Sequence, residues 1–413
     1  MKSDPRVQLL VLSSGERFSL VVDRNSGLPI HNVNLFLTCR VRNANKSHAT
    51  VAAAAGCLVL LLRFCAIFSI DLSERFASKH YLEQHELDNY LDYCWYNFES
   101  WREHSCEPVE VLRSIVRKGQ RVTSSLVHRR LTVASDYLDW LARQYIRAPN
   151  KPSEQLKDMV DYLRAIRPTP KGRNLGLINK RMSESSYAKL HEVIDESSQS
   201  NPFGAAVRER NRLLILLEDQ LGIRGGETLN IRISDIDFLK SILIVVRRAD
   251  QKDDTRSQQP LVKTQDRELT VAPWLMSEIH RYVIGSRQRV PRSKKCPYLF
   301  ITHKSGPTQG NPLSISGYKK LWQLVQQADP LLHSATAHTL RHEWNYRYSE
   351  AMDAGGFAMT EAQQEAVRSR AMGWMEGSGT ARTYNQRFIE KKAHEASLAL
   401  QEKALKALQG NRS

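Results

Sequence analysis

The stretch Ala335-Thr-Ala-His338-Thr-Leu-Arg341-His342-Glu-Trp-Asn-Tyr-Arg-Tyr348 decides how the second half of the chain is interpreted. His338 and Arg341 stand three residues apart, so on a helix they share one face and both side chains can point at one ligand. Arginine at a fixed place on a helix is suited to gripping a phosphate or carboxylate through two N–H groups, and histidine can move a proton near neutral pH. The stretch therefore predicts an anion site that can also transfer protons.

The length and charge of the chain limit the class of protein. With 413 residues it exceeds one typical core, and the natural expectation is two domains with extensions. The formal net charge is +16, from 60 Lys and Arg against 44 Asp and Glu. This balance favours a polyanionic partner, most simply nucleic acid, although a ribosomal or membrane-surface protein would share it.

The cysteines and the most apolar stretch point to a protein of a reducing compartment that does not span a membrane. No two cysteines form a C-x-x-C pair, which indicates buried thiols and neither a disulfide framework nor a zinc cluster. Residues 51–70 are long enough to cross a bilayer, but Arg63 lies inside them and would be costly at that depth. We therefore expect a buried core helix and a cytoplasmic protein. The cysteines are Cys39, Cys57, Cys65, Cys94, Cys106 and Cys296.

The first 176 residues divide into an extension, a helical domain and a linker. Residues 1–30 alternate apolar and polar side chains with a turn signal at Asn25-Ser-Gly27, which predicts a hairpin. Residues 31–165 predict a helical DNA-binding domain, with one helix opening at Thr123-Ser124. Residues 166–176 are basic and rich in Pro and Gly, as expected for a linker. The candidate DNA contacts here are Arg129, Arg130, Lys171 and Arg173, for which a merely solvated face is the alternative.

The later residues predict a mainly α fold with a small antiparallel β-sheet. Strands are expected at 242–247 and 261–271, the second with a turn near Gln265-Asp266. Thr360 and Gln363 have the spacing of a capping box for a helix that reaches Met372. We assign residues 177–386 to one domain and 387–413 to a final helix. The other helices are expected near Ser183, Ala206, Trp274, Ile315 and Ala337.

Three further motifs carry reactive side chains. Leu221-Gly-Ile-Arg224-Gly-Gly-Glu227 places an arginine near a helix N-terminus, where Glu227 can brace it and backbone N–H groups favour an anion. Lys263 lies on an expected strand just before a tight turn. Trp374 and Tyr384 occupy the segment that follows Met372. Taken one by one, each of these has an ordinary structural explanation.

Together, in this order, the motifs resemble the tyrosine recombinase (phage integrase) family. The resemblance rests on G-I-R-G-G-E-T-L-N-I, then V-K-T-x-x-R, then H-T-L-R-H, then G-W-x-x-x-S-x-T-x-x-x-Y, and covers about residues 176–387. The family has a helical DNA-binding domain followed by a catalytic domain. The resemblance implies a site-specific DNA recombinase of the integrase or transposase type, carried by a mobile element.

The resemblance also implies a role for each matching side chain. Arg224 and Arg341 would clamp the scissile phosphate and stabilise the charge of its transition state. Tyr384 would attack in line to give a 3′-phosphotyrosine. Lys263 would protonate the departing 5′ oxygen, although Lys252 in the preceding loop competes for this assignment. His338 would bind the phosphate and assist proton transfer at the tyrosine.

The remaining implications concern supporting residues and partners. Trp374 stands where many members carry histidine and would donate its indole N–H to a phosphate oxygen, while Glu227 and His342 would support the site. No metal, nucleotide or other cofactor would be needed, because the protein–DNA bond stores the phosphodiester energy. The expected partners are double-stranded DNA, further copies of the chain from dimer to tetramer, and other recombinases or accessory proteins of the same element. The last helix would dock on a neighbouring protomer.

Three alternatives remain open from the residues. His338 and His342 have the i, i+4 spacing of a zinc-binding pair, but the glutamate of H-E-x-x-H is missing. A DNA-binding protein of the same fold that does not cleave would share most of the motifs. A type IB topoisomerase would share the chemistry, although the H-x-x-R-H box favours a recombinase.

Overall fold

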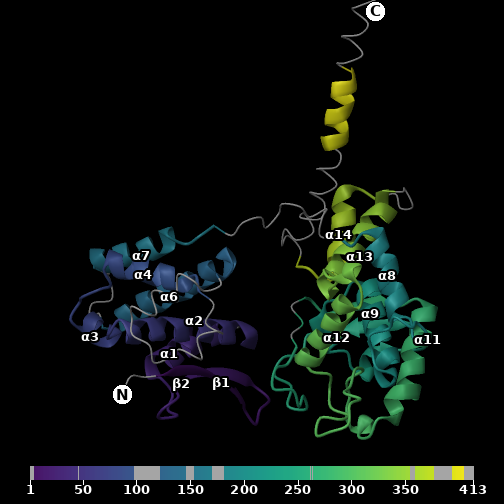
Figure 1. Ribbon diagram of the computed structural model, residues 1–413, viewed down its shortest axis with the longest axis horizontal. Helices are drawn as coiled ribbons and strands as arrows, with labels where there is room; N and C mark the ends of the chain where they lie inside the picture. The colour runs from purple at the N-terminus through teal and green to yellow at the C-terminus, as the bar shows by residue number, and fades with distance from the viewer. Residues whose placement is uncertain are drawn as a thin grey trace, which may run out of the picture. The chain divides into compact units, whose positions relative to one another are not determined.

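The computed structural model describes residues 4–44, 46–96, 121–145, 153–169, 181–260, 262, 264–353, 359–375 and 393–403 (Figure 1). The chain divides into two compact units, Met1–Arg173 and Asn174–Ser413. Each unit has its own hydrophobic core. The two units are therefore described one at a time.

The N-terminal unit begins with an antiparallel hairpin, β1 (Pro5–Val11) paired to β2 (Arg17–Asp23). The strands are joined by a turn at residues 12–16, where the Gly15 N–H donates to the Leu12 carbonyl (2.9 Å). The turn expected at residues 25–27 is also present, but it leads the chain out of β2. Val21 of β2 is buried in the core of the unit, so the hairpin is part of that core.

Helix α2 (His48–Ile67) is the central helix of this unit. Ser47 caps its first turn by accepting from the Thr50 N–H (3.4 Å). By length and composition it is the one helix among the described residues that could cross a membrane, yet 56% of its most apolar window is buried inside the protein. Arg63 extends from it to the Pro5 carbonyl (3.2 Å), which explains an arginine inside so apolar a stretch.

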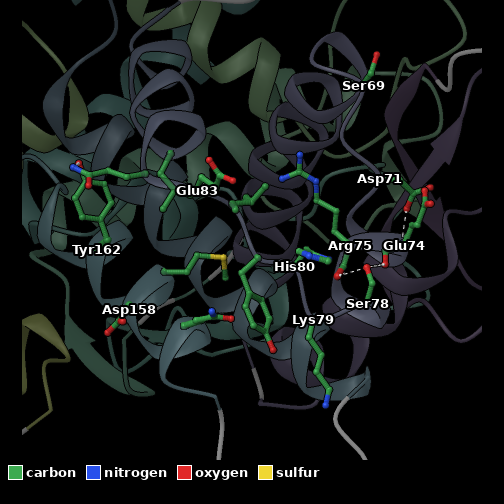
Figure 2. A pocket seen from close by; sticks show the side chains of 16 residues that line it. Ser69, Asp71, Glu74, Arg75, Ser78, Lys79, His80, Glu83, Asp158 and Tyr162 are labelled. Carbon is green, nitrogen blue, oxygen red and sulfur yellow. Dashed lines mark hydrogen bonds between the residues drawn. The ribbon is translucent and has the colours of Figure 1, made fainter.

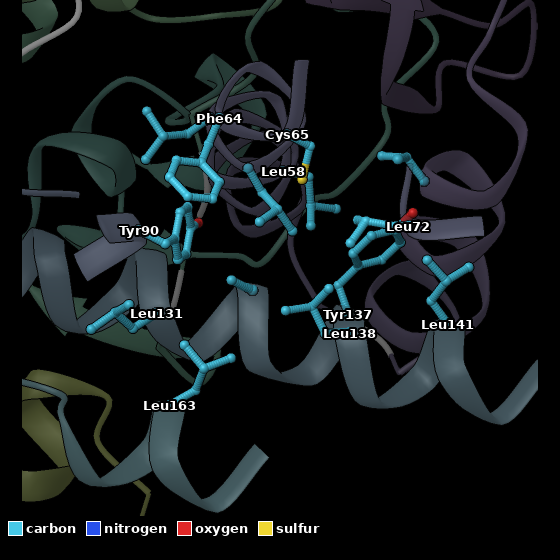
Figure 3. Packing of buried hydrophobic residues seen from close by; sticks show 14 of the residues in the cluster. Leu58, Phe64, Cys65, Leu72, Tyr90, Leu131, Tyr137, Leu138, Leu141 and Leu163 are labelled. Atoms are coloured by element: carbon cyan, nitrogen blue, oxygen red, sulfur yellow. The ribbon is translucent and has the colours of Figure 1, made fainter. Parts of the chain in front are cut away.

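Aromatic and leucine side chains join the helices of this unit to one another (Figure 3). The Phe64 ring meets Tyr90 edge-on at 5.1 Å, and Phe36 meets Tyr137 in the same way at 5.4 Å. Leu131 and Leu138 project from one face of their helix into the same cluster. The other helices are α1 (His31–Phe36), a π-helical turn (Leu37–Arg42), α3 (Leu72–Ala77), α4 (Gln84–Cys94), α6 (Ser124–Tyr145) and α7 (Glu154–Ala165).

The C-terminal unit is built mainly of helices packed around α9, whose leucines Leu213, Leu214 and Leu217 are buried. The capping box expected at Thr360 and Gln363 is present. The labelled helices of the C-terminal unit are α8 (Glu184–Ile194), α9 (Arg208–Leu221), α10 (Gly225–Thr228), α11 (Pro273–Tyr282), α12 (Ile315–Ala328), α13 (Ala337–Asp353) and α14 (Glu361–Met372). Short 3-10 turns lie at Ala205–Val207, Ile233–Asp235, Ser293–Lys295 and Pro330–Leu332, and a π-helical turn at Val283–Arg287.

The same unit carries a three-stranded antiparallel sheet of order β3-β4-β5. Its strands are β3 (Ile236–Asp237), β4 (Ile242–Val245) and β5 (Arg267–Thr270). The second strand expected from the sequence is shorter than predicted, because the Gln265 N–H donates to the Gly373 carbonyl (2.9 Å) and the β4–β5 ladder ends at Arg267. The predicted fold class, mainly α with a small antiparallel sheet, is confirmed.

Residues 393–403 form a helix whose side chains are all exposed.

Candidate active site

The turn between α9 and α10 places Arg224 at a helix N-terminus. Gly222 ends α9 in the left-handed conformation (φ 59°), and a Cβ there would lie 2.9 Å from Trp344 and Met372 side-chain atoms. Arg224 is the N-cap of α10, and its N–H donates to the Glu227 carboxylate (3.2 Å). The glycine lets the chain reverse tightly, so that Arg224 follows directly on the end of α9.

Arg341 of α13 spans the ends of two other helices. Its guanidinium donates to the Gly222 carbonyl at the end of α9 and to the Met372 carbonyl at the end of α14 (3.2 Å). It lies over the Trp374 ring at 5.5 Å and is only 2% exposed. Because helix C-termini carry partial negative charge, these two ends stabilise a buried cation. Arg341, the Arg224 turn and Trp374 are thus brought together.

Glu227 receives hydrogen bonds from three directions. Its carboxylate accepts from Arg267 Nη2 (2.7 Å), from Thr264 Oγ1 (2.7 Å) and from Arg224 Nη1 (3.4 Å). Burial raises its pKa, but the charge and hydrogen bond of Arg267, the charge of Arg341 and the Thr264 hydroxyl outweigh burial, so that the pKa is lowered overall. Glu227 is therefore an ionised counter-charge to the arginines around it.

Arg267 is a member of the site that the sequence reading did not single out. Besides Glu227 it donates from Nε to the Ala371 carbonyl (2.8 Å) and from Nη1 to Thr264 Oγ1 (3.1 Å). It stands in the pattern V-K-T-x-x-R, which was the one available signal. A charged residue at the start of a short strand gives no sign that it is buried, so its partners could not be inferred.

His338 and His342 lie one turn apart on α13, with their Nε2 atoms 3.1 Å apart and their rings edge to face. His338 is exposed whereas Arg341 is buried, so the two side chains expected on one face reach different depths. No group of three or more His, Cys, Asp or Glu side chains could hold a metal ion within the described part of the chain. The zinc interpretation thus finds no third ligand there.

Trp374 follows α14 directly. Gly373 ends that helix in the left-handed conformation (φ 64°), and the Trp374 N–H donates to the Ser369 carbonyl (2.9 Å). The indole is buried and packs with Met372 and Trp344. The left-handed glycine therefore turns the indole back toward Arg341.

The other predicted residues are placed as follows. Arg129 on α6 is exposed, but Arg130 donates to the Cys94 and Tyr96 carbonyls (2.6 and 2.8 Å) and so closes the end of α4. Lys252, the alternative lysine, is exposed in the loop before β5. Lys171, Arg173, Lys263 and Tyr384 lie outside the described residues.

Glu218 of α9 is a buried acid that lies next to α10. Tyr318 of α12 donates to Glu218 of α9 (2.7 Å), and a Cβ on Gly225 would lie 2.2 Å from the Tyr318 hydroxyl. Burial raises the pKa of Glu218 to about 8, against smaller opposing effects of the hydrogen bonds from Tyr318, Thr228 and Trp322. Glu218 thus contacts α10, the helix that follows Arg224, through Thr228, and its raised pKa favours the protonated form of the carboxyl at neutral pH.

The loop before β5 is anchored by an ion pair that the sequence did not reveal. Arg256 binds Asp254 (2.7 Å) and donates to the Leu229 and Leu313 carbonyls (3.0 and 3.2 Å), and it lies over the Tyr298 ring. Both charged side chains are buried, although the surrounding stretch is polar in sequence. The loop that leads to position 263 is therefore fixed from within.

The N-terminal unit has a separate pocket of about 800 Å³ between α3, α4 and α7 (Figure 2). Its rim carries Asp71, Glu74, Glu83 and Asp158 beside Arg75, Lys79 and His80. None of the site residues predicted from the sequence lines it. The acidic side chains make this face a poor match for a polyanion.

These features define a mainly helical protein whose C-terminal unit brings arginines from three distant segments together in a candidate site. The model of the phage integrase family matches residues 180–388, half of the chain, and the chain belongs to that family. The family resemblance expected from the motifs is therefore confirmed.

Individual relatives are more distant. Tyrosine recombinase XerA from Pyrococcus horikoshii is 29% identical over 166 residues, which cover 40% of this chain and 46% of that protein. The match thus spans about half the length of this curated relative. The XerH site-specific recombinase bound to difH substrate in a pre-cleavage complex is 15% identical, with coverage of 89% and 85% and a TM-score of 0.48. The Tn1549 transposon integrase in complex with transposon right end DNA is 14% identical, with coverage of 79% and 99% and a TM-score of 0.43.

Proposed function

We propose that this protein is a site-specific DNA recombinase that cleaves and rejoins double-stranded DNA through a covalent 3′-phosphotyrosine. The observation that carries the proposal is the junction at Arg341. This arginine bonds to the turn that leads into Arg224 and to the end of α14, just before Trp374. The Arg341 guanidinium thus joins its own motif to the Arg224 motif, more than a hundred residues earlier, and to the Trp374 motif, which follows α14. The family match supports a DNA-cleaving role for this junction.

The arginines bind the scissile phosphate in this proposal. Arg224 stands at the N-terminus of α10 with its side chain one-third exposed, where DNA can reach it. Arg341 contributes a charge held within the protein, and Trp374 contributes an indole N–H. Donors fixed before the substrate arrives stabilise the charge of a pentacoordinate phosphorus without reorganising in the reaction.

The proposed nucleophile is Tyr384 and the proposed acid is Lys263, both of which lie outside the described residues. The Tyr384 oxygen attacks phosphorus, the P–O5′ bond breaks, and the departing oxygen takes a proton from Lys263. The tyrosine proton leaves with the help of His338, which His342 contacts. Rejoining is the reverse reaction, with the 5′-hydroxyl of a new strand as attacking group. No metal or nucleotide takes part.

The wider role is proposed on the same basis. The protein acts in the cytoplasm at the nucleoid, on behalf of a mobile element, and passes from dimer to tetramer on DNA with accessory proteins or other recombinases of that element. The exposed helix 393–403, with Leu398 and Leu400 uncovered, supports the docking of this segment on a neighbouring protomer. Removal of residues after Arg387 should then harm synapsis more than binding to a single site, and equal harm to both would contradict the docking.

The decisive test uses a nicked suicide DNA substrate built from the sequences that flank the gene. Wild-type protein should form a covalent, protease-sensitive adduct, whereas the Tyr384→Phe variant should bind the same DNA and form none. Absence of an adduct with wild-type protein would favour a binding-only member of the family. The adduct should form equally well in excess chelator, because no metal takes part in the proposed reaction. A loss of activity in chelator would instead support the zinc interpretation.

A second assay separates recombination from DNA relaxation. A plasmid with two copies of the site should yield exchanged products when it is incubated with the protein. Relaxation of supercoils without exchange would instead identify a type IB topoisomerase activity.

A further inference from the structure

We propose that Arg267 is a positioning residue for the cleavage step, which fixes the segment around Lys263 against the Arg224 turn and the end of α14. The proposal rests on the role of Lys263 as the acid in the proposed function. Arg267 does not itself touch the DNA. It acts through the three segments that its side chain joins.

Each nitrogen of the Arg267 side chain bonds a different segment. Nε donates to the Ala371 carbonyl at the end of α14 (2.8 Å), Nη1 to Thr264 Oγ1 (3.1 Å) and Nη2 to Glu227 in α10 (2.7 Å). The Arg267 and Glu227 side chains are 1% and 0% exposed. A lysine has a single nitrogen and cannot reproduce this fork, so the geometry requires arginine.

The end of α14 packs closely against this fork. The Gln265 N–H donates to the Gly373 carbonyl (2.9 Å), which ties the segment before β5 to the end of α14. A Cβ on Gly373 would lie 2.7 Å from Arg267 Nη1 and 2.9 Å from the Thr264 Cβ. The guanidinium is therefore enclosed by the same two segments that it bonds.

The residues on either side of Lys263 are both fixed. Val262 is buried in the core of the unit. The Thr264 hydroxyl donates to Glu227 and accepts from Arg267, so its orientation is set from both sides. Arg267 and Glu227 thus hold Thr264, the residue that directly follows position 263 in the chain. Because a misplacement of about 1 Å can cost about a hundredfold in rate, this bracing bears on the cleavage step.

The test compares two suicide substrates that differ in one atom. In the first the scissile phosphate has its normal 5′ oxygen, and in the second a bridging sulfur replaces that oxygen. A thiolate leaves without a proton, so the sulfur substrate does not need the acid. The Lys263→Ala variant should be slower by a factor of about 10²–10⁴ on the oxygen substrate and close to wild type on sulfur.

Arg267→Gln should show the same pattern, with cleavage about a hundredfold slower on oxygen and largely restored on sulfur. Thr264→Val, which removes only the hydroxyl, should give a smaller defect with the same relief by sulfur. It serves as the second variant should Arg267→Gln not fold. Arg267→Lys should not restore oxygen cleavage, because one ammonium cannot reach three partners.

Arg287→Gln is the matched control. Arg287 is also buried in the C-terminal unit and donates to the Leu299, Cys296 and Tyr298 carbonyls, away from the site. Its loss should lower stability but leave the ratio of sulfur to oxygen cleavage at the wild-type value.

Two outcomes are kept apart by this design. If sulfur relieves Lys263→Ala but neither Arg267→Gln nor Thr264→Val, the positioning role is overturned and the proposed function stands. If wild-type protein forms no adduct with either substrate, the proposed function itself fails.

Discussion

The interiors of the two units are built from different materials. In the N-terminal unit the buried polar side chains of the described residues are Arg17, Ser19, Asn34 and Ser135, and the core around α2 is otherwise aliphatic and aromatic. The C-terminal unit buries whole ion pairs, among them Glu227 with Arg267 and Asp254 with Arg256. Both units nevertheless contain a large apolar cluster. Each unit thus has an apolar core, and the second unit buries ion pairs in addition to it.

The difference teaches where the second unit uses its stability. Apolar burial gives about 25 cal/mol per Å², whereas a buried ion pair often does no better than a well-packed apolar pair. Three of the buried charged side chains, Glu227, Arg267 and Arg341, meet at the candidate site. We infer that they are retained because they fix the directions of side chains, which apolar contacts define less sharply.

The largest expected effect comes from breaking the ion pair of the second unit. Glu227→Ala leaves the Arg267 charge buried without its partner and should lower the free energy of unfolding by about 3–5 kcal/mol. Urea denaturation measures the change. Glu227→Gln keeps an acceptor and should lose less. A loss below about 1 kcal/mol for the alanine variant would remove the contrast between the two interiors.

The second-largest loss of unfolding free energy should come from truncating an apolar side chain in the first unit. Leu58 of α2 is fully buried, and Leu58→Ala should cost about 3 kcal/mol through lost burial and the cavity left behind. Hydrogen exchange should show faster amide exchange in α2 and α6 and unchanged exchange in α9 and α13. Equal loosening of α9 and α13 would show that the two units do not unfold separately.

The pH dependence of stability should differ between the units because of Glu218. Its folded pKa of about 8 lies above the ordinary 4.5, so its contribution is fully present below pH 4.5 and is lost as the pH rises through 8. Glu218→Gln should remove a slope of up to about 1.4 kcal/mol per pH unit in that range. Unfolding at pH 5 and pH 8 measures this, and parallel curves for both proteins would refute the assignment.

The first unit offers the control for that experiment. Burial raises the pKa of its Cys65 and Cys94 thiols to about 12, so both groups stay neutral throughout the range. These two thiols should therefore add no pH-dependent slope to local hydrogen exchange in α2.

Helix caps should give the smallest effects, and equal ones in the two units. Ser47 accepts from the Thr50 N–H in α2 and Ser183 from the Ser186 N–H in α8. Replacement of either serine by alanine should cost about 1 kcal/mol in thermal or urea unfolding. Clearly unequal costs would mean that the units differ in local structure as well as in their cores.

The sequence predicted the features that depend on neighbouring residues. The Thr360 capping box and the helix that begins near Ser183 both follow from short-range chemistry. The strand before Arg267 was predicted too long, because Gln265 bonds to Gly373 across the fold and not to β4. No local pattern reveals such a partner.

The candidate site was predictable in its parts but not in its connections. The motifs singled out Arg224, His338, Arg341 and Trp374 as candidates. The bonds that hold Arg341 join it to Gly222 and Met372, far away in sequence, and Arg267 depends on Glu227 in the same way. Glu218 was missed because an acid within a leucine-rich helix gives no sign of burial. Tertiary packing decides these positions.

The place of Arg341 between two helix ends has a consequence for ionic strength. At about 0.15 M salt, charges in solvent are screened beyond about 8 Å, whereas buried charges are screened much less. Arg129 is exposed and the Arg224 side chain is one-third exposed, so counterions can reach both, whereas Arg341 is buried. Under the proposed function, salt should therefore weaken the binding of DNA while the buried half of the site stays assembled.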